Sequence, residues 1–413
     1  MEYNTIFFGD VAKIKNGYAF KSKEFQEKGI PVIKIKNIIS PIVDTKDSQK
    51  VSIKTYEKTK GFSLKKNDIL ISLTGSGVNQ MSSAVGKVGR IEFDYPALQN
   101  QRVGKFELKY SNSADLDFLF YYFLQPKITE YLVRNSTGSA NQANINSKLI
   151  ETVKIPNFSL IKQKSISNFL NQITRKIETN QKMIANLEKL SQILFKRWFI
   201  DFEFPNEEGI PYKSSGGEMI DSEIGEIPKG WEISKLDKII NIKSGKRPRN
   251  KVNIMDNKNK TPIIGASKIM GYTSDYLESE PILVMGRVGT HGVIQRFNNN
   301  VWPSDNTFII KSQFMIYTYF ILINIDYKSL NRGSTQPLLS QKDIKNINII
   351  IPKSDSLIVK YEEITNIYFK EINVIKDQIS YLIELRDTLL PKLMSGELEI
   401  PDDIEVNSDE FSI

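Results

Sequence analysis

The sequence has no cysteine and only one histidine, His291, among its 413 residues. Without cysteine the chain can form neither a disulfide nor a thiolate zinc site, and it has no cysteine nucleophile. A single histidine also excludes any metal site that needs two histidine ligands. The missing disulfides fit a reducing compartment, and we expect the protein in the cytoplasm.

Long apolar runs are missing as well. No stretch reaches 18 uncharged apolar residues, and the first ten residues, MEYNTIFFGD, lack the basic start and apolar core of a secretion signal. We therefore expect neither a membrane span nor secretion.

Recognisable catalytic motifs are also missing from the sequence. It contains no GxxxxGK[ST] phosphate loop and no Asn-Pro-Pro-Tyr or Asp-Pro-Pro-Tyr string of the kind that holds a flipped adenine. No histidine pair or acid-rich metal motif stands out before the C-terminal tail. These absences favour a protein without catalysis of its own, which binds no metal or cofactor.

Positive charge is present in excess, and it is unevenly distributed. The last 17 residues, Glu397 to Ile413, carry seven acids and no base, so they read as a disordered acidic tail. The rest of the chain then holds 56 basic against 41 acidic residues, an excess of 15. A folded body with this excess of positive charge favours a polyanionic partner. The alternative is that the charge comes from a lysine-rich composition and serves only to keep the protein soluble.

Two segments carry the apolar stripe of a coiled-coil helix. Between Ile166 and Trp198, and again between Ile372 and Leu389, apolar residues recur at steps of three and four. We expect Pro391 to kink or end the second helix and Gly396 to close the segment. A stripe of this period needs a partner, so the two helices are expected to pair antiparallel within the chain.

Each of these helices follows a similar series of signals. The stretches Val133 to Pro156 and Ser329 to Pro352 both carry a polar Gly-Ser tract, an Ile-rich strand and a proline. Upstream, the first half should have one alternating strand over residues 30–38 and two helices separated at Pro126. The second half repeats this order of elements. The sequence thus predicts a mixed α/β protein with an internal duplication.

The predicted domains follow from this order of elements. We assign residues 1–158 to a first globular domain and residues 159–204 to the central helix. Residues 205–350 form a linker and a second globular domain, residues 351–396 the C-terminal helix, and residues 397–413 the tail.

This arrangement resembles the specificity subunits of type I restriction-modification systems, and the resemblance covers nearly the whole chain. The segments that carry it are FGDVAKIKNGYAFKS, LFKRWFIDFEFP, GEIPKGWEISKLDKIINIKSGKRP, the paired tracts STGSANQANIN and RGSTQPLLSQKDI, and LRDTLLPKLMSGELEIP. The resemblance implies two target-recognition domains that each read one half of a bipartite sequence in double-stranded DNA, with the helices as a spacer. It also implies no catalysis by this chain.

The resemblance further implies partner proteins. Two methyltransferase subunits would bind S-adenosylmethionine and methylate adenine at N6, and an endonuclease/translocase subunit would join for cleavage. S-adenosylmethionine, ATP and magnesium are then expected on the partner subunits.

Candidate DNA-binding residues are of two kinds. Asn, Gln and Arg can form paired hydrogen bonds with base edges, whereas Lys more often holds phosphates. In the first half we select Lys15, Lys21, Lys34, Lys36, Asn79, Gln80, Lys87, Arg90, Gln99, Asn100, Gln101, Arg102, Asn141 and Gln142. In the second half we select Lys243, Lys246, Arg247, Arg249, Arg287, Thr290, His291, Asn306, Arg332, Ser334, Thr335 and Gln336.

Other interpretations stay open at this stage. Asn, Ser and Gly also form ordinary turns, so the polar loops need not contact DNA. The main alternative function is a self-contained DNA methyltransferase or endonuclease with its own target recognition. A coiled-coil interaction protein with incidental positive charge is a third possibility.

Overall fold

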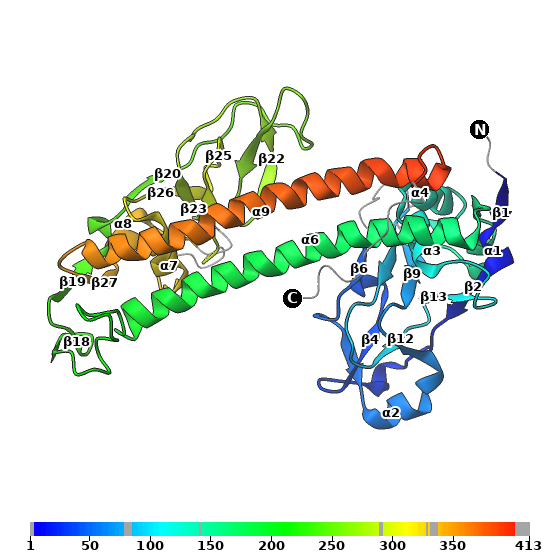
Figure 1. Cartoon of the computed structure of the whole chain (residues 1–413), viewed down its shortest axis with the longest axis horizontal. Helices are drawn as coiled ribbons and strands as arrows, with labels where there is room; N and C mark the ends of the chain where they lie inside the picture. Colours follow the sequence, from blue (N-terminus) through cyan, green and yellow to red (C-terminus); the bar gives the residue numbers. More distant parts are fainter. Residues whose placement is uncertain are drawn as a thin grey trace. The chain divides into compact units, whose positions relative to one another are not determined.

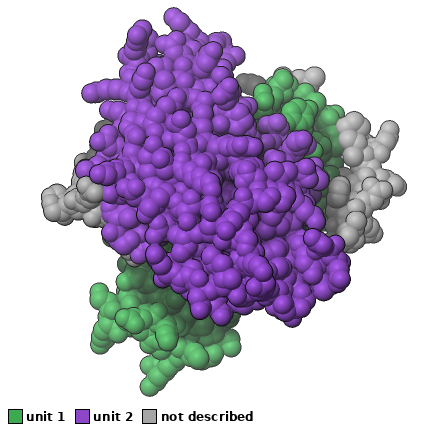
Figure 2. Space-filling model, turned by 90° about the vertical axis from the view of Figure 1, so that its left-hand side faces the viewer, with its two compact units in different colours: residues 1–179, 378–413 green, residues 180–377 purple. Residues whose placement is uncertain are grey.

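The computed structural model describes residues 4–77, 85–139, 142–288, 292–327, 329–330 and 338–400. It divides into two compact units, residues 1–179 with 378–413 and residues 180–377 (Figure 2). Two long helices, α6 (Leu160–Phe195) and α9 (Ser356–Ser395), contribute to both units (Figure 1). The mixed α/β fold class predicted from the sequence is confirmed.

The first unit contains two main sheets. One has the order β2 (Ala12–Asn16), β13 (Val103–Leu108), β9 (Ile69–Ser72), β11 (Val88–Arg90), β6 (Ile42–Val43), β5 (Ile38–Ile39). The other has the order β3 (Phe25–Gln26), β7 (Gln49–Val51), β4 (Ile30–Ile33), β12 (Ala97–Gln99), β8 (Ser63–Leu64). All neighbours are antiparallel except β11 with β6 and β4 with β12.

Smaller elements complete the first unit. Strand β1 (Thr5–Phe7) pairs with β16 (Lys154–Pro156), and β10 (Thr74–Gly75), β15 (Gln142–Asn144) and β14 (Thr137–Ser139) form a three-stranded sheet. The helices are α1 (Phe8–Val11), α2 (Ile53–Lys58), α3 (Leu116–Leu124), α4 (Pro126–Arg134) and α5 (Ser147–Glu151). Pro126 is the first residue of α4, so the predicted separation of two helices at this proline is confirmed.

Aromatic side chains form the centre of the first core. Phe8, Phe106 and Phe123 are almost completely buried and meet edge to face, with ring centroids 5.0 to 5.1 Å apart. Ile166 and Leu170 of α6 and Leu393 of α9 belong to the same cluster. The core of the first unit is therefore continuous with the long helices.

The second unit repeats this plan in a shorter form. One sheet has the order β20 (Asn241–Ser244), β26 (Thr307–Lys311), β23 (Ile282–Gly286), β24 (Ile294–Phe297), and the other β22 (Ile269–Thr273), β21 (Thr261–Ile264), β25 (Trp302–Pro303). Strand β19 (Trp231–Lys235) pairs with β27 (Asn348–Pro352), and β17 (Met219–Ile220) with β18 (Ile227–Pro228). The helices are α7 (Met315–Ile323) and α8 (Gln341–Lys345).

The strand order reveals the duplication directly. The series β2-β13-β9-β11 of the first unit matches β20-β26-β23-β24 of the second, and in both units the neighbours are antiparallel. The parallel pair β4 and β12 likewise matches β21 and β25. In the first copy α3 and α4 follow the sheet, and in the second copy α7 alone does so, before the short helix and the long one. The internal duplication predicted from the sequence is thus confirmed.

Opposite ends of the two long helices meet within each unit. In the first unit, Lys162 near the start of α6 pairs with Glu399 just after α9, at 2.5 Å. In the second, the Tyr361 hydroxyl near the start of α9 donates to the Ser191 carbonyl near the end of α6, at 3.0 Å. The two helices therefore run antiparallel, as the heptad pattern predicted.

Of the two outcomes expected at Pro391, a kink or an end of the helix, the structure excludes the end. Helix α9 continues through Pro391 to Ser395, because the buried Leu393 and Met394 hold the last turn in the core. Gly396 then closes it with a φ of 67°. The strand predicted over residues 30–38 ends at Ile33, because the Asn37 side chain accepts a hydrogen bond from the Lys34 amide and closes a 3₁₀ turn.

Candidate nucleic-acid interface

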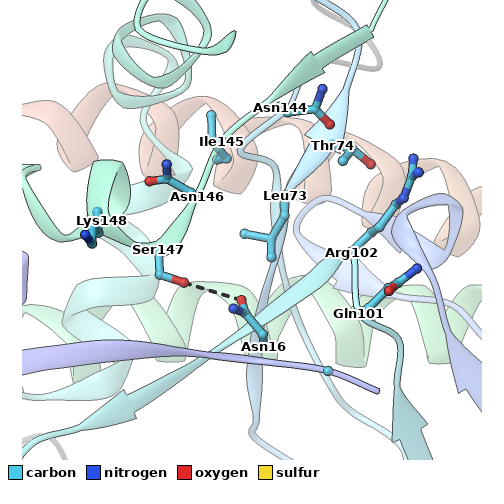
Figure 3. Close-up of a pocket in the computed structure, with 11 residues that line it drawn as sticks. Asn16, Leu73, Thr74, Gln101, Arg102, Asn144, Ile145, Asn146, Ser147 and Lys148 are labelled. Carbon is cyan, nitrogen blue, oxygen red and sulfur yellow. Dashed lines mark hydrogen bonds between the residues drawn. The ribbon is translucent and has the colours of Figure 1, made fainter. Parts of the chain in front are cut away.

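Four chain segments of the first unit converge on one groove, about 640 Å³ in volume, whose lining residues are mostly of polar type (Figure 3). We call these segments the first hub. The lining residues are Asn16 at the end of β2 and Gly17 after it, Leu73 and Thr74 after β9, Gln101 and Arg102 between β12 and β13, and the run from Asn144 to Lys148. The groove thus brings together loops that lie far apart in the sequence.

Backbone hydrogen bonds fix the geometry of the first hub. The Tyr18 amide donates to the Gln99 carbonyl at 2.9 Å. The Leu73 amide donates to the Arg102 carbonyl at 3.0 Å, and the Ile145 amide donates to the Leu73 carbonyl at 3.0 Å. Each loop is therefore held by its neighbour rather than by its own turn alone.

The second unit contains the same series of bonds. The Lys246 amide donates to the Pro303 carbonyl at 3.0 Å. The Arg287 amide donates to the Asn306 carbonyl at 2.8 Å, and the Leu339 amide donates to the Arg287 carbonyl at 3.0 Å. We call the segments around Ser244, Arg287, Asn306 and Leu339 the second hub. These bonds make Arg287 equivalent to Leu73 and Asn306 equivalent to Arg102.

A glycine stands at the same place in both hubs. An added Cβ at Gly17 would lie 2.3 Å from the Asn100 carbonyl oxygen, and at Gly245 it would lie 2.2 Å from that of Ser304. Any larger residue would push the strand away from the neighbouring loop. A close backbone approach is therefore built into each hub.

The short helices α5 and α8 are tied to the hubs in the same way. The Ser147 hydroxyl donates to the Asn16 side chain at 3.3 Å, and a 3.0 Å hydrogen bond joins the Gln341 and Ser244 side chains. At the helix start, the Asn146 side chain accepts from the Leu149 amide at 2.9 Å. The start of each short helix is thus anchored against the sheet.

Part of the predicted base-reading set lies in the first hub. Gln101 and Arg102 are exposed and line the groove, and Gln142 is exposed on the adjacent strand β15. Asn100 is only 9% exposed, and its side chain accepts from the Arg102 amide at 3.3 Å. Asn100 therefore shapes the loop that presents its two neighbours.

Two predicted contacts are corrected by the structure. Gln99 is 1% exposed, and its amide donates to the carbonyls of Lys15 and Val103, so it cannot reach a base edge. The Arg90 side chain is 15% exposed, pairs with Asp117 at 3.3 Å and donates to Asn171 at 3.0 Å. Both were predicted from residue type alone, and both hold the fold together.

The predicted lysines of the first unit have different surroundings. Lys21 and Lys36 are exposed, Lys15 pairs with Glu107 at 3.5 Å, and Lys87 is partly buried beside β11. Lys34 lies over the Phe25 ring at 4.2 Å and hydrogen-bonds Gln49. Burial, and then the charge of Lys36, lowers the pKa of Lys34.

The basic run of the second unit lines a separate surface pocket. Lys246, Arg247 and Arg249 are exposed there beside Asp275 and Trp302, whose indole donates to the Lys246 carbonyl at 2.7 Å. This anchor holds the start of the basic run against β25.

Lys243, by contrast, is engaged within the protein. It forms an ion pair with Glu278, whose side chain is only 6% exposed and also pairs with Lys311 at 3.0 Å. Burial raises the pKa of Glu278, but the hydrogen bonds from Lys243 and Lys311 outweigh it and leave the pKa lowered.

Arg287 and Asn306 are both at the second hub. Asn306 is exposed, and Arg287 is partly buried over the Phe308 ring, 6.0 Å from its centroid. The other predicted residues lie outside the described part of the chain: Asn79, Gln80, Asn141, Thr290, His291, Arg332, Ser334, Thr335 and Gln336.

Several residues that line the first hub were not predicted from the sequence. Asn16, Thr74, Asn146 and Lys148 face the same groove as Arg102. Thr74 lies two residues after the end of the buried strand β9, and the end of a strand that enters a Gly-Ser tract was an available signal for it.

The described residues contain neither a membrane-spanning helix nor a metal-binding cluster. In the described residues, no helix is both long and apolar enough to cross a membrane. Within the same ranges, no group of three or more His, Cys, Asp or Glu side chains could hold a metal ion. The described part of the chain thus presents two related hubs on a duplicated scaffold.

Comparison with known proteins identifies the family. The model of the type I restriction modification DNA specificity domain matches residues 1–189 and 228–379. The MjaIX specificity subunit of Methanocaldococcus jannaschii is 28% identical over 312 residues, 69% of each chain. The MjaVIII subunit of the same organism is 24% identical over 371 residues, 81% of this chain and 80% of that protein.

A solved structure shows the same fold. The crystal structure of a type I restriction-modification S subunit from M. genitalium covers 95% of this chain and 96% of its own, with a TM-score of 0.57 at 18% identity. The chain belongs to the type I restriction-modification specificity family, and it is a specificity subunit rather than a catalytic one. DNA target recognition is the role that this family implies.

Proposed function

We propose that this chain reads a bipartite sequence in double-stranded DNA, one half-site with each unit. The recognition domains would comprise residues 1–158 and 205–350, and the two long helices would set the distance between them. The observation that carries the proposal is the repeated series of hub bonds, Leu73–Arg102–Ile145 in one unit and Arg287–Asn306–Leu339 in the other. A single chain with two equivalent readers imitates the two-fold dimers that bind palindromic DNA.

The charge of the surface supports a duplex as the target. Arg102 in the first hub and Lys246, Arg247 and Arg249 in the second unit are exposed. Arginine can recognise guanine edges, and clustered basic side chains hold phosphates, so Arg102 suits a base edge and the basic run of the second unit suits the phosphate backbone. The proposed interface omits Arg90 and Gln99, because both side chains are engaged within the fold. It includes Thr74, Asn144 and Lys148, because they line the groove of the first hub.

Chemistry would come from partner proteins. In this proposal two methyltransferase subunits supply S-adenosylmethionine and methylate adenine at N6, and an endonuclease/translocase subunit uses ATP and magnesium. The complex would act in the cytoplasm, where it meets the chromosome. The specificity subunit would contribute target choice and the spacing of the two half-sites.

Mapping of DNA methylation in cells with and without the gene tests this function. We expect one bipartite adenine-methylated sequence that is present only with the gene. The double substitution Q101A/R102A should relax one half-site and leave the other unchanged. Methyl transfer by the purified chain alone, or equal relaxation of both half-sites, would contradict the proposal.

A further inference from the structure

The two hubs can be aligned residue by residue through their strand register. In the first unit Val103 lies opposite Ser72, which places Arg102 opposite Leu73 at the next position. In the second, Thr307 lies opposite Gly286, which places Asn306 opposite Arg287. The side chains of directly opposite residues lie on the same face of a sheet. The side chains of Arg102 and Asn306 therefore leave the two sheets at equivalent positions and on the same face.

A second pair follows in each hub. Thr74 pairs with Asn144 in the first unit, and Val288 forms a bridge with Leu338 in the second. The first pair is polar and partly buried, whereas Leu338 is an apolar side chain that is 37% exposed. Figure 3 shows Thr74, Arg102 and Asn144 gathered on one side of the groove. The same backbone thus carries different chemistry in the two hubs.

The packing around Leu73 differs from that around Arg287. Two residues after Arg102 stands Gly104, where an added Cβ would meet side-chain atoms of Ile14 at 2.5 Å, Ile71 at 3.0 Å and Leu73 at 3.3 Å, so these three apolar side chains share the space that a larger residue would take. The equivalent residue of the second unit is Phe308, and Arg287 lies over its ring. Leu73 thus belongs to the first core, whereas Arg287 is partly buried over an aromatic ring.

Arg102 and Asn306 are available to a ligand. Both are exposed, and among the described residues neither the Arg102 guanidinium nor the Asn306 amide has a side-chain ion pair or hydrogen bond. Arginine forms two hydrogen bonds with O6 and N7 of guanine, and asparagine forms two with N6 and N7 of adenine. The apolar side chains of Val288 and Leu338 suit contact with a thymine methyl group.

We propose that residues 102, 74 and 144 and their equivalents 306, 288 and 338 determine the sequence specificity of the two half-sites. Arg102 reads a guanine in the half-site of the first unit. Asn306 reads an adenine at the equivalent step of the other half-site, next to a thymine that contacts Val288 and Leu338. This assignment rests on the proposed function and adds to it the base class that each hub reads.

The reciprocal exchanges R102N and N306R test the assignment in cells that carry the full system. For R102N we expect the preference at one position of one half-site to change from guanine toward adenine. For N306R we expect the reverse in the other half-site. Discrimination at the exchanged position should change on the order of 10- to 100-fold, the contribution of one bidentate contact.

Matched variants separate this outcome from loss of folding. R102A should only relax the same position, because it removes the contact without offering another. R134N replaces an exposed arginine of α4 that pairs with Glu130 at 3.9 Å and does not line the groove, so the methylated sequence should stay unchanged. Normal thermal unfolding of each purified variant would show that the fold is intact.

The possible results are distinct. Continued methylation of the unchanged bipartite sequence by R102N, R102A and N306R would overturn the assignment and leave the proposed function in place. A wild-type system that methylates no bipartite sequence would instead contradict the proposed function itself.

Discussion

Arg90 in β11 and Arg296 in β24 occupy the same position in the equivalent sheets of the two units. Arg90 lies opposite Ile69 in β9, and Arg296 lies opposite Leu283 in the equivalent strand β23. Each guanidinium lies over a ring of the following helix, 4.3 Å from Phe120 and 5.6 Å from Tyr319. Arginine at this position thus connects the sheet to the helices in both units.

The ion pair of Arg90 with Asp117 leads to the first prediction. R90A should lower the free energy of unfolding by about 2 kcal/mol, less than the ~3–5 kcal/mol of a fully buried pair. The smaller value is expected because the Asp117 side chain is 34% exposed. Chemical denaturation measures the loss, and the methylated sequence should not change. Normal stability with an altered half-site would mean that Arg90 contacts DNA.

The close approach at Gly17 leads to the second prediction. In G17A the new methyl group would displace the loop that carries Gln101 and Arg102, at a cost of ~1–3 kcal/mol. Recognition of the half-site read by the first unit should weaken, and the other half-site should keep its sequence. The control is G61A, because nothing lies within 4 Å of an added Cβ there. An unaffected G17A variant would show that the hub tolerates movement of this loop.

Salt dependence tests the role of the basic run. The triple substitution K246A/R247A/R249A should reduce the slope of log affinity against log salt by up to about 3, since each lost phosphate contact removes about 0.9. Binding of the complex to duplex DNA at several salt concentrations measures the slope. K243A should change it less, because Lys243 already pairs with Glu278. If K243A reduced the slope as much per residue as the triple substitution does, the distinction between the paired Lys243 and the phosphate-binding basic run would be contradicted.

The lowered pKa of Glu278 predicts a dependence of stability on pH. A carboxyl group with a depressed pKa in the folded state stabilises the protein above its unfolded pKa. That stability is lost as the pH falls from the ordinary glutamate value of 4.5 toward the folded pKa. E278Q should therefore be less stable at neutral pH and should lose less stability on acidification. Parallel pH curves for the two proteins would contradict this role.

Periodicity alone was sufficient to predict the helical part of the fold. The apolar stripe identified both long helices and their antiparallel pairing, because a 3.5-residue repeat must bury its seam against a partner. Periodicity could not predict that α9 continues through Pro391. The buried Leu393 and Met394 keep the helix intact beyond the proline, and such tertiary support has no local signal.

The candidate site was only partly predictable for a related reason. Residue type alone predicted both Arg102 and Arg90 as DNA contacts. Only the fold shows that Arg102 is exposed and that Arg90 forms an ion pair with Asp117. Thr74 gave no signal of its own, because its place beside Asn144 depends on pairing between distant strands. The equivalence of Arg102 and Asn306 likewise needed the register of the strands.

The spacer role of the helices is tested most directly by lengthening both of them together. Seven residues inserted after Thr179 in α6 and seven after Asp377 in α9 would preserve the heptad pattern at the boundary between the units. At about 1.5 Å per residue, this adds roughly 10 Å, or about three base pairs at ~3.4 Å each. Methylation mapping should then show the same two half-sites with about three more unread base pairs between them. An unchanged gap, or altered half-sites with the insertion folded, would contradict the account.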